Sequence, residues 1–249
     1  MYEAVANGRI NKVPLLIGMN SEEEISLAGD LDNFAKTVRN YEKNIQLLAD
    51  EDMYIDDESV RTTARGGNKG AIYTDGLLQD NLPAAVQLYL SISVTTGLGR
   101  AIIRYADLQS QYSDVYFYQF SYHGLLGGNN VSLEGIGRVA HAEDTKYLWS
   151  SQDGTDLSGY PAADVTTLDR YVALFTNFAK NLNQTPSESD LLQNLILPKV
   201  SSDKFYYLDI DENLEIKQNP REFSFTEVGR SIRNICKGNR LYLISYSNK

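Results

Sequence analysis

The sequence predicts an α/β fold, in which helices alternate with buried strands. Two short apolar segments have the pattern of strands in a parallel sheet, amphipathic helical segments lie between and after them, and a β-hairpin pattern follows. With 249 residues, of which 42% are hydrophobic, the chain can bury a full core. We therefore expect one domain, or part of a larger one, rather than two.

The first half of the chain contains one of the two predicted sheet strands. A short helical pattern over 2–7 ends at Gly8, a residue well suited to the end of a helix. The unbroken apolar run from Val13 to Gly18 predicts a strand buried on both faces, with a short buried helix as the alternative. Apolar spacing and turn residues then predict a helix over 31–48, a loop over 61–76 and helices over 83–90 and 98–108.

The second half begins with the other sheet strand, the aromatic and β-branched segment from Val115 to Tyr122. A glycine-rich loop over 124–130 and a short helix over 143–149 follow it. Asp164 is expected to cap a longer helix. The predicted buried stripe of that helix is Val165, Leu168, Tyr171, Val172, Phe175, Phe178 and Ala179. Segments 205–210 and 214–216 predict a β-hairpin.

Charge and cysteine content exclude several classes of protein. The chain has 23 basic and 33 acidic residues, a net charge of −10. Such a surface repels nucleic acid and anionic lipid headgroups, and no apolar run reaches the length of a membrane span. Cys236 is the single cysteine, so neither an internal disulfide nor a metal site built on thiolates is expected.

Acidic residues and a histidine follow the two predicted sheet strands. Glu22, Glu23 and Glu24 come shortly after the first strand. The loop after the second strand carries His141, one of two histidines in the chain. Serine hydrolases use an imidazole that exchanges a proton with the nucleophile, and a carboxylate that fixes the tautomer of the imidazole. The order of acid before histidine is the one found in α/β-hydrolases.

Five blocks of sequence resemble the type-B carboxylesterase (cholinesterase-like) family of α/β-hydrolases. They are VPLLIG at 13–18 leading into Asn20-Ser21-Glu22-Glu23, VYFYQFSY at 115–122, VAHAEDTKYLW at 139–149, FTNFAK at 175–180 and YLDI at 207–210. They occur in the order of the family and are closest in style to insect esterases. The resemblance implies that Glu23 is the acid of the triad and His141 its base.

Two residues depart from the family pattern. Glu24 stands where the family has glycine after the acid, and Arg138 stands where glycine precedes the histidine block. Because Glu24 and Glu22 are carboxylates beside Glu23, either one is an alternative as the orienting acid.

The nucleophile elbow Gly-x-Ser-x-Gly and the glycine-rich oxyanion segment are absent from the sequence. We therefore expect residues 1–249 to be the C-terminal portion of an α/β-hydrolase domain, inactive alone, with the N-terminal half of the same domain as its partner. The resemblance implies a small-molecule ester substrate and no cofactor or metal. The competing interpretation is a non-catalytic cholinesterase-like binding or adhesion module, or a vestigial truncated esterase.

Several other motifs carry less weight. Sequons at Asn130 and Asn183 predict N-glycosylation and fit a secreted parent protein. The run Gly66–Gly70 lacks the Gly-Lys-Ser/Thr of a phosphate loop, and the calcium-like spacing of 209–213 is better explained by a hairpin turn. His123 is expected to have a structural or surface role. A Cys236–His141 nucleophile pair remains an alternative to serine chemistry.

Overall fold

The computed structural model describes residues 2–30, 32–33, 35–36, 98–133, 137–149, 156–201 and 203–220. The chain divides into two compact units, the first formed by 1–26, 102–132 and 136–220, and the second by 27–101, 133–135 and 221–249. The predicted helix over 83–90, the loop over 61–76 with its glycine-rich run, and Cys236 lie outside the described residues. So does the predicted helix over 31–48, apart from four of its residues.

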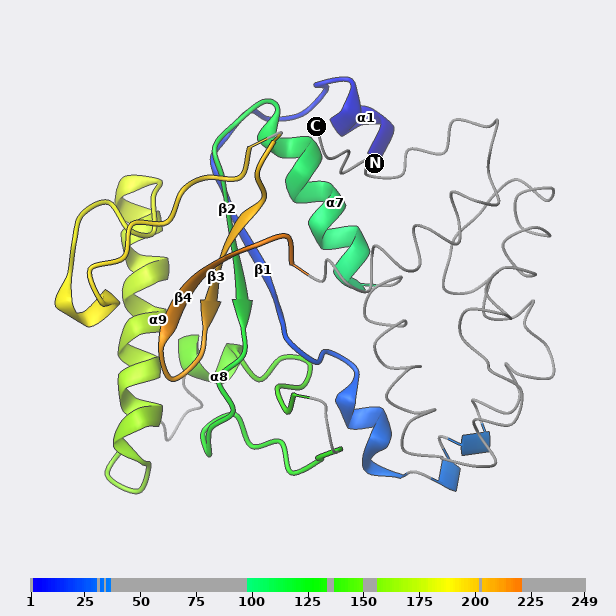
Figure 1. Ribbon diagram of the computed structural model, residues 1–249, viewed down its shortest axis with the longest axis vertical. Helices are drawn as coiled ribbons and strands as arrows, with labels where there is room; N and C mark the ends of the chain where they lie inside the picture. The colour runs from blue at the N-terminus through cyan, green and yellow to red at the C-terminus, as the bar shows by residue number, and fades with distance from the viewer. Residues whose placement is uncertain are drawn as a thin grey trace. The chain divides into compact units, whose positions relative to one another are not determined.

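A four-stranded sheet forms the centre of the first unit (Figure 1). Its strands are β1 (Leu15–Asn20), β2 (Val115–Phe120), β3 (Tyr206–Ile210) and β4 (Leu214–Gln218). They lie in the order β1-β2-β3-β4, with β1, β2 and β3 parallel and β4 antiparallel to β3. The predicted α/β class and the two predicted sheet strands are confirmed. The segment predicted as the first hairpin strand is β3, which joins the sheet as a third parallel strand.

Strand β1 is shifted along the chain relative to its prediction. It begins at Leu15 and continues through Gly18 to Asn20, whereas the sequence suggested an end at the glycine. Gly18 lies opposite Tyr118 of β2, and a Cβ atom at Gly18 would lie 2.5 Å from the Tyr118 ring. The glycine therefore lets that ring lie across β1 without interrupting the strand, and β1 ends two residues nearer to the acidic cluster.

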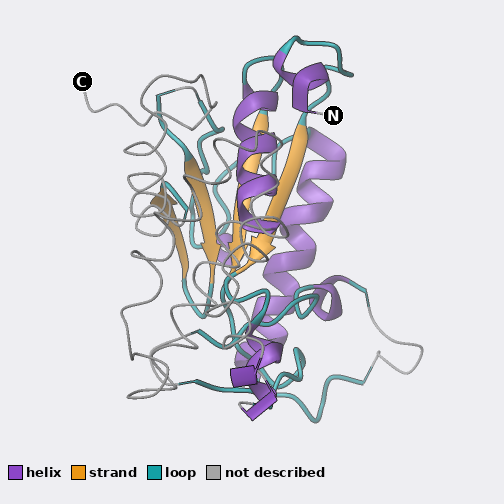
Figure 2. Ribbon diagram, turned by 90° about the vertical axis from the view of Figure 1, so that its right-hand side faces the viewer, coloured by secondary structure: helices purple, strands orange, loops and turns teal. Residues whose placement is uncertain are grey.

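Helices lie on both sides of the sheet. Those of the described residues are α1 (Tyr2–Ala6), α7 (Leu98–Ser110), α8 (Thr145–Leu148) and α9 (Ala162–Asn181), with 3₁₀ turns η1 (Ile25–Gly29) and η2 (Asp190–Leu192). The two views show α9 along one side of the strands and α7 along the other (Figures 1 and 2). Gly8 follows α1 with φ of +67°, which fits its predicted role at the end of a helix.

The buried face of α9 is rotated by about one residue from its prediction. The fully buried positions are Asp164, Thr167, Tyr171 and Leu174, whereas Val172, placed in the predicted stripe, is 38% exposed. Tyr171 meets Tyr118 and Phe120 of β2 at ring-centroid distances of 5.7 and 5.1 Å. Such tilted and edge-on aromatic pairs add about 0.5–1.5 kcal/mol each beyond area burial. This aromatic layer fixes α9 against β2.

Asp164 does not cap α9, contrary to the prediction. The helix begins at Ala162, with Pro161 in the N-cap position, and Asp164 lies in the first turn with 1% exposure. Its carboxylate accepts hydrogen bonds from the Leu125 and Leu126 amides at 3.2 and 3.3 Å, and from the Tyr147 hydroxyl at 2.7 Å. Asp164 thus joins the loop after β2 and helix α8 to α9.

The predicted hairpin is confirmed as β3 and β4, and β4 runs to Gln218. It is part of the main sheet, because residues 208–210 pair with residues 118–120 of β2. Arg170 of α9 donates to the carbonyl oxygens of Leu191 and Glu212 at 3.0 and 2.7 Å. The turn of the hairpin is therefore held by a helix as well as by the sheet.

Candidate active site

The candidate site lies beyond the carboxyl ends of β1 and β2, where loops leave two adjacent parallel strands. Figure 1 shows α8 at the end of the sheet toward which these two strands point. Loops at this edge of a parallel sheet are where α/β proteins bind ligands and place reactive groups. The loop after β1 carries the glutamates, and the long loop after β2 carries His141.

The structure brings Glu23 and His141 together across 118 positions of sequence. The Nδ1 atom of His141 lies 2.7 Å from Oε2 of Glu23. The Glu23 side chain is 7% exposed, whereas that of His141 is 70% exposed. The other carboxylate oxygen, Oε1, accepts a hydrogen bond from the backbone N–H of Asn20 at 2.8 Å. A buried, hydrogen-bonded carboxylate on Nδ1 fixes the imidazole tautomer in which Nε2 is a proton acceptor.

Backbone hydrogen bonds connect the two loops beside this pair. The Ser21 amide donates to the Phe120 carbonyl at 2.9 Å, continuing the β1–β2 ladder past the ends of the strands. The Glu22 amide donates to the Val139 carbonyl at 3.0 Å, and the His141 amide donates to the Glu23 carbonyl at 3.1 Å. These hydrogen bonds align the backbone of the acid loop with that of the histidine loop.

The turn that follows His141 is held by Glu143. Ala142 has φ of +64°, a left-handed conformation unusual for a residue with a Cβ atom. The Glu143 carboxylate, on a residue 5% exposed, accepts hydrogen bonds from the backbone amides of Ala140 and Asn129. Lys146 of α8 donates to the Gly127 carbonyl at 2.6 Å. These contacts attach the histidine loop to the glycine-rich loop that leaves β2.

The other sequence candidates occupy different positions. Glu22 and Glu24 are half-buried, and the contact to the imidazole is made by Glu23. Arg138 is exposed, and its carbonyl accepts the Asn129 side-chain amide at 2.7 Å. His123 is half-buried, and its Nδ1 atom has no hydrogen-bond partner among the described residues.

Four residues of the site were missed by sequence reasoning. Asn20, Tyr118, Asp144 and Tyr171 form a hydrogen-bonded group beneath the acid–histidine pair. They come from β1, β2, the histidine loop and α9, so no local pattern could have grouped them. The available signal was the placement of Asn20 and Asp144, polar residues three positions from Glu23 and His141 respectively.

The two sequons differ in surroundings. Asn130 is exposed, whereas Asn183 is half-buried and its side-chain oxygen accepts the Thr185 amide at 2.9 Å. The Thr185 hydroxyl, on a residue 1% exposed, accepts the Leu197 amide at 2.8 Å. The Asn183 sequon is therefore built into a turn of the fold, and the Asn130 sequon is not.

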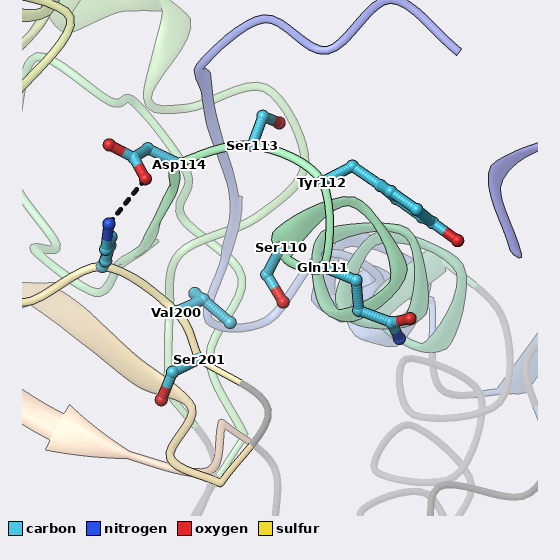
Figure 3. Close-up of a pocket in the computed structure, with 8 residues that line it drawn as sticks. Ser110, Gln111, Tyr112, Ser113, Asp114, Val200 and Ser201 are labelled. Carbon is cyan, nitrogen blue, oxygen red and sulfur yellow. Dashed lines mark hydrogen bonds and ion pairs between the residues drawn. The ribbon is translucent and has the colours of Figure 1, made fainter. Parts of the chain in front are cut away.

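A polar surface depression of about 540 Å³ lies at the other end of the strands, away from the candidate site (Figure 3). It is lined by Ser110–Asp114 and Lys199–Ser201, next to the start of β2. Its charged groups are Lys199 and Asp114, which form an ion pair of 2.8 Å and are both well exposed. Exposed pairs of this kind contribute little, about 0–1 kcal/mol. The depression contains no imidazole or buried carboxylate, so it is not the candidate active site.

Over the part of the chain that the structure describes, no group of three or more His, Cys, Asp or Glu side chains could hold a metal ion. None of the described helices is both long and apolar enough to cross a membrane.

A mixed sheet with helices on both sides, in which a glutamate and then a histidine follow adjacent parallel strands, matches part of an α/β-hydrolase fold. The chain belongs to the carboxylesterase family, whose model matches residues 2–226. A comparison with curated proteins finds no match.

Solved structures with a similar fold include esterases. Juvenile hormone esterase from Manduca sexta, with OTFP covalently attached, is 19% identical with a TM-score of 0.68 over 93% of this chain and 43% of that one. A PNB esterase is 14% identical with a TM-score of 0.58 over 91% of this chain and 40% of that one. The chain thus spans less than half the length of the esterase structures that it matches.

Proposed function

We propose that this chain supplies the acid and the histidine of a Ser–Glu–His triad that hydrolyses carboxylic esters. The observation that carries the proposal is the 2.7 Å contact between Nδ1 of His141 and Oε2 of the buried Glu23. Membership of the carboxylesterase family supports a small-molecule ester as the substrate class. The exposed imidazole, with 70% of its side-chain surface open, is accessible to a nucleophile from another segment.

In the proposed reaction, Nε2 of His141 takes the proton of a serine hydroxyl while the serine oxygen attacks the ester carbonyl carbon. The imidazolium then gives that proton to the departing alcohol, which leaves an acyl-serine. For hydrolysis of the acyl-serine, Nε2 takes a proton from water and returns it to the serine oxygen. Glu23 stays ionised throughout and stabilises the imidazolium through Nδ1.

The serine and the oxyanion donors are assigned to a longer polypeptide. The sequence contains no Gly-x-Ser-x-Gly, and the chain covers 40–43% of the esterase structures compared above. We therefore expect the 249-residue chain to be inactive alone and to act together with the preceding half of an esterase domain. Secretion and glycosylation at Asn130 are part of the same proposal, because that sequon is exposed.

A fluorophosphonate probe, whose phosphorus is attacked by an activated serine with loss of fluoride to form a phosphonate ester, tests the proposal. Native protein captured with an antibody to this chain is expected to be larger than 27.9 kDa, to contain a Gly-x-Ser-x-Gly peptide and to react with the probe. The recombinant 249-residue chain should not react. Native protein of 27.9 kDa, apart from glycans, that ignores the probe would establish the non-catalytic alternative. Labelling of the 249-residue chain that disappears in His141→Ala would instead place the nucleophile within it.

A further inference from the structure

The last residue of β1, Asn20, contacts the acid Glu23 and the backbone of the residue before His141. Its backbone N–H donates to Oε1 of Glu23 at 2.8 Å. Its side-chain Nδ2 donates to the carbonyl oxygen of Ala140, the residue before His141, at 2.7 Å. The residue is 1% exposed, so these contacts are shielded from water. One buried residue therefore links the acid carboxylate to the backbone of the histidine loop.

The same amide group reaches a second carboxylate. Nδ2 of Asn20 lies 3.2 Å from Oδ1 of Asp144, three residues after His141. The other oxygen of Asp144 accepts the Tyr171 hydroxyl at 2.9 Å and lies 3.5 Å from the Tyr118 hydroxyl. Asp144 thus contacts side chains from β1, β2 and α9.

The hydroxyl groups of Tyr118 and Tyr171 stay protonated and can therefore donate hydrogen bonds to Asp144. Tyr171 is 1% exposed and Tyr118 is 9% exposed. Burial raises the pKa of both hydroxyls well above the ordinary value, so both remain protonated across the physiological range. With these donors on Oδ2, Oδ1 of Asp144 is left to accept the Asn20 amide. The buried tyrosines therefore fix the position of the Asp144 carboxylate. Because Asp144 belongs to the histidine loop, this also restrains the loop.

The Asn20 amide oxygen shows which part of the side chain is used. This buried Oδ1 atom has no hydrogen-bond partner among the described residues. A buried acceptor without a partner opposes folding, so the amide stabilises the fold less than a fully bonded group would. The side chain acts through Nδ2, which donates hydrogen bonds to Ala140 and Asp144, one before and one after His141 in the sequence.

We propose that Asn20 is a positioning residue for the His141 imidazole. Building on the proposed function, we assign to its Nδ2 group the task of holding the histidine loop at Ala140 and Asp144, while its backbone amide holds Glu23. The imidazole is 70% exposed and cannot be oriented by packing alone. Loss of the Asn20 side-chain amide leaves the backbone hydrogen bond to Glu23 in place and lets His141 move relative to Glu23.

Histidine-selective ¹⁵N NMR of the 249-residue chain tests this role. The chain has two histidines, so His123 provides an internal reference for His141. In the wild type, His141 is expected to be in the Nδ1–H tautomer, with a low-field Nδ1 proton that exchanges slowly with water. In Asn20→Ala this resonance should broaden and its exchange should accelerate about tenfold, the factor that corresponds to the loss of one hydrogen bond of about 1.4 kcal/mol.

Gln109→Ala is the matched control. Gln109 is another buried amide, 3% exposed, and it donates to Ser113 at 2.8 Å and toward the Asn11 and Val13 carbonyls that precede β1. Its removal should lower the melting temperature by an amount similar to Asn20→Ala and leave the His141 resonance unchanged. An equal change of His141 in both variants would reduce Asn20 to a residue of general stability and overturn the inference.

A second variant keeps the test decisive if Asn20→Ala does not fold. Tyr171→Phe preserves the aromatic packing and removes the 2.9 Å donor to Asp144, so the His141 resonance should change in the same direction but less. An unchanged His141 in Tyr171→Phe, or in a folded Asn20→Ala, contradicts the role of Asn20. A wild-type spectrum without the Nδ1–H tautomer instead contradicts the Glu23–His141 pair and with it the proposed function.

Discussion

Replacement of Asp164 by alanine tests the hydrogen bonds that tie α9 to the loop after β2. Asp164 is 1% exposed and accepts three hydrogen bonds. The variant leaves the Tyr147 hydroxyl, on a residue 1% exposed, without an acceptor, which costs about 1–3 kcal/mol. The Leu125 and Leu126 amides lie in a loop that water can reach, so their loss costs about 0.5 kcal/mol each.

The expected destabilisation by Asp164→Ala is therefore about 3 kcal/mol, or a fall in melting temperature of about 6–12 °C for a chain of this size. Thermal unfolding followed by far-UV circular dichroism measures it. Asp169→Ala is the control, because Asp169 is exposed on the same helix and its loss should cost less than about 0.5 kcal/mol.

The double variant Asp164→Ala/Tyr147→Phe separates the hydroxyl contribution. Tyr147→Phe removes the hydroxyl that Asp164→Ala leaves without an acceptor. The double variant should therefore be less destabilised than the sum of the single variants by about 1 kcal/mol. If Asp164→Ala melts within 1 °C of Asp169→Ala, about the resolution of the assay, the buried carboxylate does not hold the loop and the reasoning is refuted.

Three further predictions concern the site and its surroundings. Ala142→Gly relieves a residue with φ of +64° and should raise the melting temperature by about 1–3 °C in a calorimetric scan; a fall would show that the turn is not strained. In the longer esterase proposed above, Glu23→Gln should lower kcat about 10⁴-fold with KM little changed, measured with an aryl ester; a loss below about tenfold would assign the acid to another carboxylate. In a secretory expression host, Asn130→Gln should remove one glycan from the intact mass, whereas an unchanged glycan mass would show that Asn130 is not modified.

Sequence patterns were sufficient for features set by local chemistry. Both sheet strands and the hairpin are found where apolar and β-branched residues are concentrated, because burial on a sheet favours those residues. The end of β1 was misplaced because Gly18 was interpreted as a strand breaker. Its structural reason, the ring of Tyr118 on the neighbouring strand, depends on a residue one hundred positions away.

The error in α9 has a similar origin. Hydrophobicity favoured Val172 for the buried face, but the helix turns Asp164 and Thr167 inward instead. Asp164 is tolerated there because two amides and a hydroxyl satisfy its carboxylate. A single sequence cannot reveal such compensation, because the donors lie 17 to 39 residues away.

For the candidate site, the sequence indicated the residue types and order but not the supporting contacts. Position after two strands indicated three neighbouring glutamates and His141, and the resemblance to the carboxylesterase family singled out Glu23 among them. The structure places Glu23 and His141 in hydrogen-bonding contact. Which of the three neighbouring glutamates faces the imidazole was decided by the path of the loop after β1. The role of Asn20 depends on contacts across 120 or more positions and has no local signature.

The parallel pairing of β1 with β2 also determines when the site can form during folding. Leu15 pairs with Val115, so the chain must close a crossover of about one hundred residues before the first contact between these strands is made. Pairings this distant are slow, because the entropy of closing the loop is lost before any contact compensates for it. The acid–histidine contact lies at the far end of this same pairing. Its appearance in a refolding experiment should therefore follow the slowest phase, and partly folded chains should contain both residues but not the pair.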